Sequence, residues 1–146
     1  MNKGLKIAMS SEGAYIRDKN SKLGGSWDSK LLKDLGYKKG MILRIKMVNF
    51  LTYDECEVFP GPKLNVILGP NGTGKSTVMH AVCLVCAGKT DTIGRSNKTS
   101  QFIKHGKDGP NDETYIEIDL LGKNIGDGVG KTVRVKRTLK SIGSTK

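Results

Sequence analysis

The chain has 146 residues, with 25 Lys and Arg against 14 Asp and Glu, which gives a formal net charge of +11. Its three cysteines, an odd number, argue against a disulfide framework, and the longest apolar run is too short to span a bilayer, so we expect no membrane partner. The composition is typical of a cytosolic or nuclear protein with an anionic partner, and nucleic acid is the first candidate.

Residues 1–40 show no sustained apolar period. They are rich in Lys, Gly, Ser and Asp and carry turn signals at 20–21 and 24–25. We therefore expect a disordered basic tail over 1–40, with one short helix at 28–35, and a folded region over 41–146.

Three strand patterns follow in the folded region. Residues 41–50 alternate between apolar and polar over their first half, which predicts a strand with one solvated face. After a turn, a second short strand is expected at 56–60, where a Pro-Gly-Pro sequence stops it. Residues 64–68, LNVIL, form a continuous apolar run that predicts a strand buried on both faces.

The rest of the chain predicts one main helix and a final pair of strands. In order, the patterns indicate a helix at 75–87 ended by Gly88, an irregular loop at 89–113 with one helical turn at 101–104, and strands at 114–121 and 132–139. The last two strands should pair antiparallel, because a short turn joins them. We expect an α/β fold with a mixed sheet, and the set of elements looks incomplete.

A phosphate-binding loop lies between the apolar strand and the helix. The sequence GPNGTGKS at 69–76 fits the pattern G-x-x-x-x-G-K-[ST] at every fixed position. The glycines let backbone N–H groups turn toward phosphates, Lys75 adds a positive charge, and the Ser76 hydroxyl can bind Mg²⁺. The residues predicted to bind ATP are Gly69, Pro70, Asn71, Gly72, Thr73, Gly74, Lys75, Ser76 and Thr77.

Hydrolysis needs a further carboxylate, and the sequence offers only a weak candidate for it. Asp119 ends the strand YIEID, but this segment alternates in polarity, whereas a Walker B strand has four apolar residues before its Asp. Asp119 also opens a D-x-x-G sequence, yet no N-K-x-D follows to read guanine. A nucleotide kinase would need an Arg-rich lid. We expect ATP–Mg²⁺ binding without hydrolysis by this chain alone, and predict no catalytic residue.

The cysteines and histidines do not suggest a metal site. Cys83 and Cys86 lie three residues apart inside the predicted helix, and are predicted to be small buried apolar side chains. We expect His80 and His105 at the surface.

The sequence from Ile42 to Thr77, with NFLTYD at 49–54 and FPGPKLNV at 59–66, resembles the N-terminal half of a structural maintenance of chromosomes (SMC) head. The resemblance covers about residues 41–139 and implies a P-loop NTPase fold of the ABC/SMC type. It further implies a split ATPase of the nucleus and chromosome that acts in recombinational DNA repair. The phosphate loop comes from the N-terminal lobe, and the signature motif and Walker B carboxylates come from a C-terminal lobe.

The same resemblance implies partners. ATP with Mg²⁺ would lie between two SMC heads, one of which this chain helps to form. The other would be the head of the sixth member of the SMC family. The chain departs from the family pattern because we find no signature motif beyond a look-alike at 23–26, no Walker B strand and no coiled-coil heptads. Gln101 lies too near the loop to be given a catalytic role. We therefore expect a truncated N-terminal lobe that needs the missing C-terminal lobe.

Basic residues could also contact the DNA backbone. Arg95, Lys98, Lys104 and Lys107 lie in the loop after the helix, where an arginine of SMC heads can meet DNA, and Arg95 would match that arginine. Arg134, Lys136 and Arg137 could form a second phosphate-contacting face. Two alternatives therefore stay open: a basic DNA-associating fragment with a vestigial nucleotide site, or a non-functional truncation.

Overall fold

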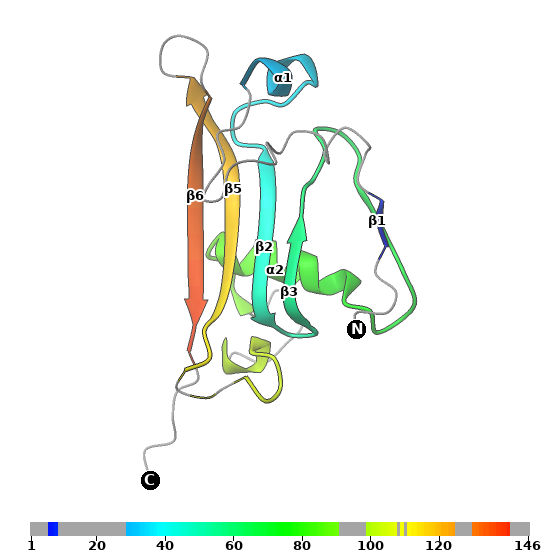
Figure 1. Ribbon diagram of the computed structural model, residues 1–146, viewed down its shortest axis with the longest axis vertical. Helices are drawn as coiled ribbons and strands as arrows, with labels where there is room; N and C mark the ends of the chain where they lie inside the picture. Colours follow the sequence, from blue (N-terminus) through cyan, green and yellow to red (C-terminus); the bar gives the residue numbers. More distant parts are fainter. Residues whose placement is uncertain are drawn as a thin grey trace.

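The computed structural model describes residues 6–8, 29–90, 99–107, 109, 111–124 and 130–140. Its centre is a four-stranded sheet in the order β3-β2-β5-β6 (Figure 1). The strands are β2 (Ile42–Phe50), β3 (Tyr53–Val58), β5 (Thr114–Asn124) and β6 (Gly130–Leu139). The strands predicted at 41–50, 114–121 and 132–139 are confirmed, with small changes at their ends.

Alternation of apolar and charged residues sets the two faces of this sheet. On β2, Leu43, Ile45 and Met47 are buried while Arg44 and Lys46 point to the other face. Strand β3 begins at Tyr53, earlier than the predicted 56–60, because a tight turn at 51–52 returns the chain at once and Phe50 pairs with Tyr53. Leu51 takes a positive φ of 49° in that turn.

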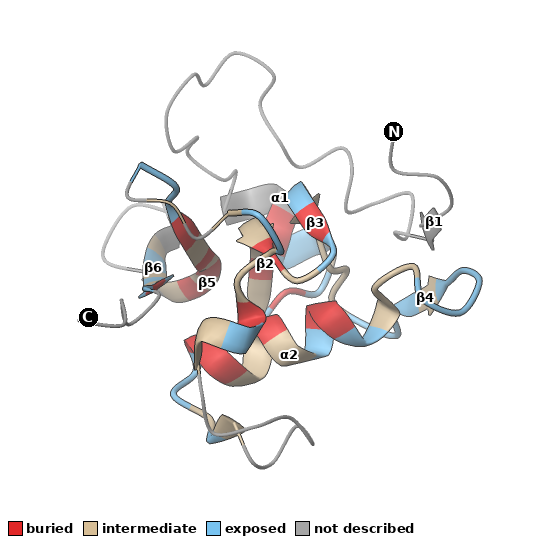
Figure 2. Cartoon of the chain, turned by 90° about the horizontal axis from the view of Figure 1, so that it is seen from below, coloured by how far each residue is buried: buried red, intermediate tan, exposed pale blue. Residues whose placement is uncertain are grey.

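Helix α2 (Lys75–Val85) lies across one face of the sheet and packs against it to form the main core (Figures 1 and 2). Its buried apolar side chains, Val78, Ala81, Leu84 and Val85, pack with Ile45, Met47, Ile116 and Ile118 of the sheet. The short 3₁₀ helix η2 (Thr99–Phe102), predicted as a helical turn at 101–104, adds Phe102, which stacks on Phe50 with ring centroids 6.0 Å apart.

The end of α2 differs from the prediction in one respect. The helix ends at Val85, and Ala87 rather than Gly88 takes the left-handed conformation, with φ 62°. The Gly88 amide donates to the Cys83 carbonyl at 2.8 Å and the Ala87 amide to the Leu84 carbonyl at 3.1 Å. Glycine is still required at 88, since a Cβ there would lie 2.3 Å from the Cys83 Sγ.

The helix predicted at 28–35 is α1 (Ser29–Asp34), and the segment around it packs on the sheet. Leu32 and Tyr37 form a second small core with Leu43 and Leu121. The Gly40 amide donates to the Leu121 carbonyl at 2.7 Å. Packed residues therefore begin before position 41, where the sequence placed the start of the folded region. Residues 1–5 and 9–28 of the predicted tail lie outside the described residues.

Strand β4 (Val66–Leu68) does not join the central sheet. It pairs antiparallel with β1 (Lys6–Ala8) in a separate two-stranded sheet. The prediction that 64–68 is buried on both faces is wrong: Leu64 is 84% exposed and Leu68 58%, and only Ile67 packs against the main core. Every pairing among the described strands is antiparallel, so the structure differs here from the mixed sheet expected from the sequence. Within the described part of the chain, no helix is long and apolar enough to cross a membrane.

Candidate functional site

The loop at 69–74 joins β4 to α2 and lies at the surface. Gly72 and Gly74 have φ of 81° and 89°, a left-handed conformation that glycine adopts without strain. The Thr73 hydroxyl donates to the Pro70 carbonyl at 2.8 Å, which closes the turn. Residues 69–72 are exposed, so the backbone of the loop is open to a ligand.

Helix α2 begins directly after this loop, with Gly74 at its N-cap position. The Thr77 amide donates to the Gly74 carbonyl at 3.0 Å. The remaining amides of the first helical turn have no acceptor within the helix, and with the helix dipole they make its N-terminus favourable for an anion. The Ser76 side chain is exposed beside these amides, whereas Thr77 is buried.

Lys75 reaches back over the loop. Its Nζ donates to the carbonyls of Gly69 at 2.8 Å and Pro70 at 2.7 Å. The ammonium is therefore held above the same turn that presents the loop amides, which is where a polyphosphate would need a positive charge.

A tyrosine that the sequence analysis did not single out supports the loop from below. The Tyr53 hydroxyl lies 3.2 Å from the Thr73 carbonyl oxygen and 3.1 Å from that of Gly74, and shares its proton between them. Burial raises the pKa of Tyr53 to about 12, with a smaller contribution from Cys56. The signal lay in the NFLTYD sequence, which pointed to the family but not to this contact.

The residues present fit a nucleotide triphosphate with Mg²⁺. Backbone amides at a helix N-terminus, a lysine ammonium and glycines with positive φ are donors and shapes suited to phosphate oxygens. The exposed Ser76 hydroxyl is an oxygen ligand of the kind that Mg²⁺ prefers. Among the described residues, no group of three or more His, Cys, Asp or Glu could hold a metal ion.

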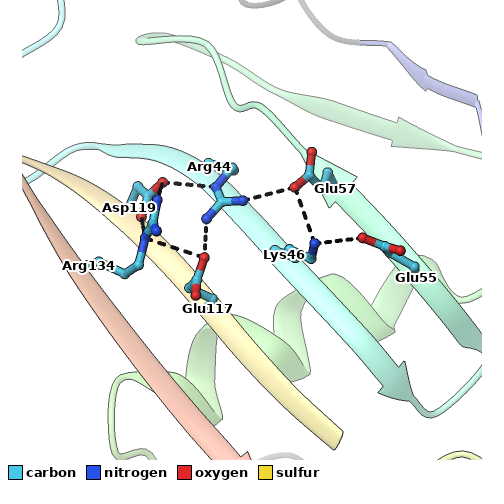
Figure 3. A network of polar contacts seen from close by, with 7 residues as sticks. All are labelled: Arg44, Lys46, Glu55, Glu57, Glu117, Asp119 and Arg134. Carbon is cyan, nitrogen blue, oxygen red and sulfur yellow. Dashed lines mark hydrogen bonds and ion pairs between the residues drawn. The ribbon is translucent and has the colours of Figure 1, made fainter. Parts of the chain in front are cut away.

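Asp119, the weak carboxylate candidate, belongs to a network of charged side chains on the sheet face opposite α2 (Figure 3). Its carboxylate accepts from the Arg44 Nε at 2.9 Å and from the Arg134 Nε at 2.7 Å. Arg44 also pairs with Glu57 and Glu117. Burial alone would raise the pKa of Asp119, but bonds and charges from Arg134 and Arg44 outweigh it and lower that pKa. Asp119 therefore holds the strands together rather than offering a free carboxylate.

The structure pairs the candidate DNA-contacting residues that it describes. Lys104 forms an ion pair with Asp54 at 2.5 Å, and Lys136 one with Glu113 at 2.7 Å. Arg137 donates to the Leu84 carbonyl at the end of α2. Arg134 pairs with Asp119, and Lys107 lies 3.8 Å from Asp112. Arg95 and Lys98 lie outside the described residues.

The cysteines and histidines only partly follow the predictions. Cys83 is half-buried, but Cys86 is exposed because the helix has already ended at Val85. His105 is exposed as expected. His80 is half-buried, and its ring meets the edge of Phe102 at 6.3 Å between centroids.

Comparison with known proteins agrees with this arrangement. A family model described as an AAA domain matches residues 44–146. Structural maintenance of chromosomes protein 5 of Schizosaccharomyces pombe is 54% identical over 84 residues, which cover 58% of this chain and 7% of that protein. The protein of the same name from Caenorhabditis elegans is 40% identical over 100 residues, covering 68% and 9%. The chain thus spans less than a tenth of these relatives.

A structural likeness supports the same fold. A chain solved in work on ATP-driven dimerization and DNA-stimulated activation of SMC ATPases superposes with a TM-score of 0.55 at 20% identity. The match covers 68% of this chain and 63% of the other. At this identity the likeness shows the fold alone, that of an N-terminal half of a P-loop NTPase head.

Proposed function

The chain belongs to the AAA domain family and is an N-terminal head segment of the SMC type, and from this premise we propose that it binds ATP with Mg²⁺ through the loop at 69–77. The observation that carries the proposal is the Lys75 ammonium held over a glycine turn at the N-terminus of α2. A bound Mg²⁺ supplies charge neutralisation for the phosphates. The loop amides and Lys75 bind and orient the phosphates, and Ser76 supplies an oxygen ligand for the cation.

Two features support a second lobe as partner. Leu64, Val66 and Leu68, every second residue just before and within β4, are exposed, and Met79 on α2 is 65% exposed. Exposed apolar side chains of this size next to a ligand loop are typical of an interaction surface. We propose that a C-terminal head lobe covers them and brings the carboxylates that hydrolysis needs.

The wider role follows from the relatives. Their names place them in chromosome maintenance, and the chain also matches structural maintenance of chromosomes protein 6 of Schizosaccharomyces pombe at 28% identity. We propose that the chain acts as part of a chromosomal ATPase in the nucleus, in recombinational DNA repair, with the head of the sixth family member as its second head and with DNA as a further partner.

Calorimetric titration of the 146-residue chain with MgATP tests the binding site. We expect Lys75→Ala to weaken binding at least tenfold, since the variant removes the positive charge held over the loop. The control is Lys63→Ala, an exposed lysine before β4, which should bind like the wild type. A folded wild-type chain that takes up no MgATP, or a Lys75→Ala variant of unchanged affinity, would refute the proposal.

The Ser76→Ala variant tests the binding of Mg²⁺ separately from the binding of the phosphates. We expect this variant to keep ATP binding in EDTA but to lose most of the gain that Mg²⁺ gives the wild type, because the hydroxyl is the predicted cation ligand. An unchanged response to Mg²⁺ would show that Ser76 is not a ligand of the cation.

Adding a separately expressed C-terminal lobe should raise ATP turnover in the wild type and not in Lys75→Ala.

A further inference from the structure

We propose that Tyr53 is a positioning residue for the phosphate loop: its hydroxyl holds two loop carbonyls on the sheet side, so that the amides joined to them face the ligand. The inference rests on the proposed nucleotide site and deepens it. It assigns to β3, an element that precedes the loop in the chain, a direct part in setting the shape of the site.

The argument begins with the geometry of the peptide unit. In a trans peptide the C=O and N–H groups point in opposite directions. The Thr73 carbonyl belongs to the same unit as the Gly74 amide, and the Gly74 carbonyl to the same unit as the Lys75 amide. Tyr53 lies 3.2 Å and 3.1 Å from those two carbonyl oxygens. The Gly74 and Lys75 N–H groups must therefore point away from Tyr53, to the open side of the loop.

The same contact also fixes where α2 begins. The Gly74 carbonyl that meets Tyr53 also accepts the Thr77 amide at 3.0 Å, the first backbone bond of the helix. A carbonyl has two lone pairs and can accept both bonds. Tyr53 thus ties the turn and the first turn of the helix to one fixed point on the sheet.

The space around Tyr53 leaves no alternative at position 74. A Cβ added to Gly74 would lie 2.5 Å from the Thr52 Oγ1 and 2.8 Å from the Tyr53 hydroxyl oxygen. Such distances are too short for real atoms, so a side chain at 74 would push the hydroxyl from the carbonyls. Tyr53 is 4% exposed and its ring sits in the main core, which holds the hydroxyl in place.

A purely structural role would be a hydroxyl that satisfies the core and nothing more. Tyr37 provides a matched control, because it is also buried, at 6% exposure, and its hydroxyl donates to a backbone carbonyl, that of Pro60, at 2.7 Å. Tyr53→Phe and Tyr37→Phe each remove one hydroxyl; the first removes the hydrogen bond shared by the Thr73 and Gly74 carbonyls, and the second removes the bond to the Pro60 carbonyl. Only the first of these bonds reaches the phosphate loop.

The experiment compares both variants with the wild-type chain in two measurements. In Tyr53→Phe we expect MgATP affinity to fall about three- to tenfold, the effect of one lost hydrogen bond. We also expect the ¹⁵N order parameters of the Gly74 and Lys75 amides to fall in the free chain. In Tyr37→Phe, affinity and loop order parameters should match the wild type.

Three results would overturn the inference. They are unchanged loop order parameters in Tyr53→Phe, equal changes in both variants, or a loss of order over the whole sheet. If the wild type binds no MgATP, the proposed function fails alone, and the order parameters of the free loop still decide the role of Tyr53.

Discussion

The central sheet and the β4–loop segment are built in contrasting ways. The sheet has both faces occupied: α2 packs on one, and on the other Arg44 and Asp119 belong to a network of paired charges (Figures 2 and 3). The β4–loop segment, residues 64–74, has a three-residue strand, exposed apolar side chains and a loop braced by Tyr53. In the sheet, most side chains make their contacts within the chain, whereas the β4–loop segment exposes groups that a ligand or a partner could contact.

This contrast separates two kinds of substitution. A change in the sheet should lower the free energy of unfolding, because it breaks contacts that the chain makes with itself. Replacing an exposed side chain of the β4–loop segment should leave that free energy nearly unchanged and alter the binding of a ligand or partner instead. The following predictions test this division, beginning with the largest expected effect.

Removing the central carboxylate of the sheet should cost the most. In Asp119→Ala the guanidinium groups of Arg44 and Arg134 lose their buried partner. We expect the free energy of unfolding to fall by about 2–4 kcal/mol, less than for an isolated buried pair, because Glu117 still pairs with both arginines. Urea unfolding followed by circular dichroism measures the change. Glu55→Ala, which removes a 62% exposed partner of Lys46, should cost less than about 1 kcal/mol.

The effect of Asp119 should depend on pH in a defined direction. Its pKa is lowered in the folded chain, so its contribution is complete above the ordinary carboxyl pKa of about 4 and is lost as the pH falls below it. The difference between wild type and Asp119→Ala should therefore shrink in acid. Equal losses for Asp119→Ala and Glu55→Ala at neutral pH would contradict the contrast between buried and exposed pairs.

The hydrogen bonds from the Tyr53 hydroxyl to the loop should be lost at high pH. Because the pKa of Tyr53 is raised to about 12, from about 10 in an unfolded chain, its contribution is complete below pH 10 and is lost as the pH rises toward 12. A shift of this size corresponds to a loss on the order of 2–3 kcal/mol. Urea unfolding between pH 9 and 12 should show this fall in the wild type. A Tyr53→Phe chain with the same alkaline loss would disprove the assignment to Tyr53.

Alanine substitutions at Gly72 and Gly74 should weaken MgATP binding to different extents, although both glycines have positive φ. An alanine at either position adds about 1–2 kcal/mol of local backbone strain. At Gly72 the new Cβ would meet nothing within 4 Å, whereas at Gly74 it would collide with Thr52 and Tyr53. We expect Gly74→Ala to weaken MgATP binding more than Gly72→Ala does, by calorimetry. Equal affinities would mean that contact with Tyr53 does not shape the loop.

The sequence predicted those parts of the molecule whose signals are local. The loop at 69–76 is a contiguous pattern in which each residue serves its neighbours, and α2 starts at Lys75 as predicted. The strands of the sheet were found because their alternation reports one buried face. The helix near 29–34 was expected, but not the packing of Leu32 on Leu43, since that contact joins residues distant in the sequence.

The failures share one physical cause, which is that burial depends on what lies opposite. LNVIL at 64–68 has the composition of a strand buried on both faces, but of its apolar side chains only Ile67 packs against the main core. The alternation around Asp119 predicted a half-exposed strand, yet long arginine side chains from β2 and β6 cover its carboxylate. Similarly, Tyr53 and Gly74 are 21 residues apart, and no spacing rule connects them.

The smallest effect is expected on the exposed face of β4, where it is also the most informative. Leu68 is 58% exposed and Ile67, its neighbour, packs against the core. We expect Leu68→Ser to change the free energy of unfolding by less than about 0.5 kcal/mol, and Ile67→Ser to lower it by about 1–3 kcal/mol. Both would be measured by urea unfolding.

A second measurement uses the affinity of the chain for an added C-terminal lobe. Leu68→Ser should weaken this association, because the Leu68 side chain would lie in the contact. If Leu68→Ser lowered the free energy of unfolding of the isolated chain by several kcal/mol, this face of β4 would already be covered within the chain. The contrast between the sheet and the exposed β4–loop segment would then not hold.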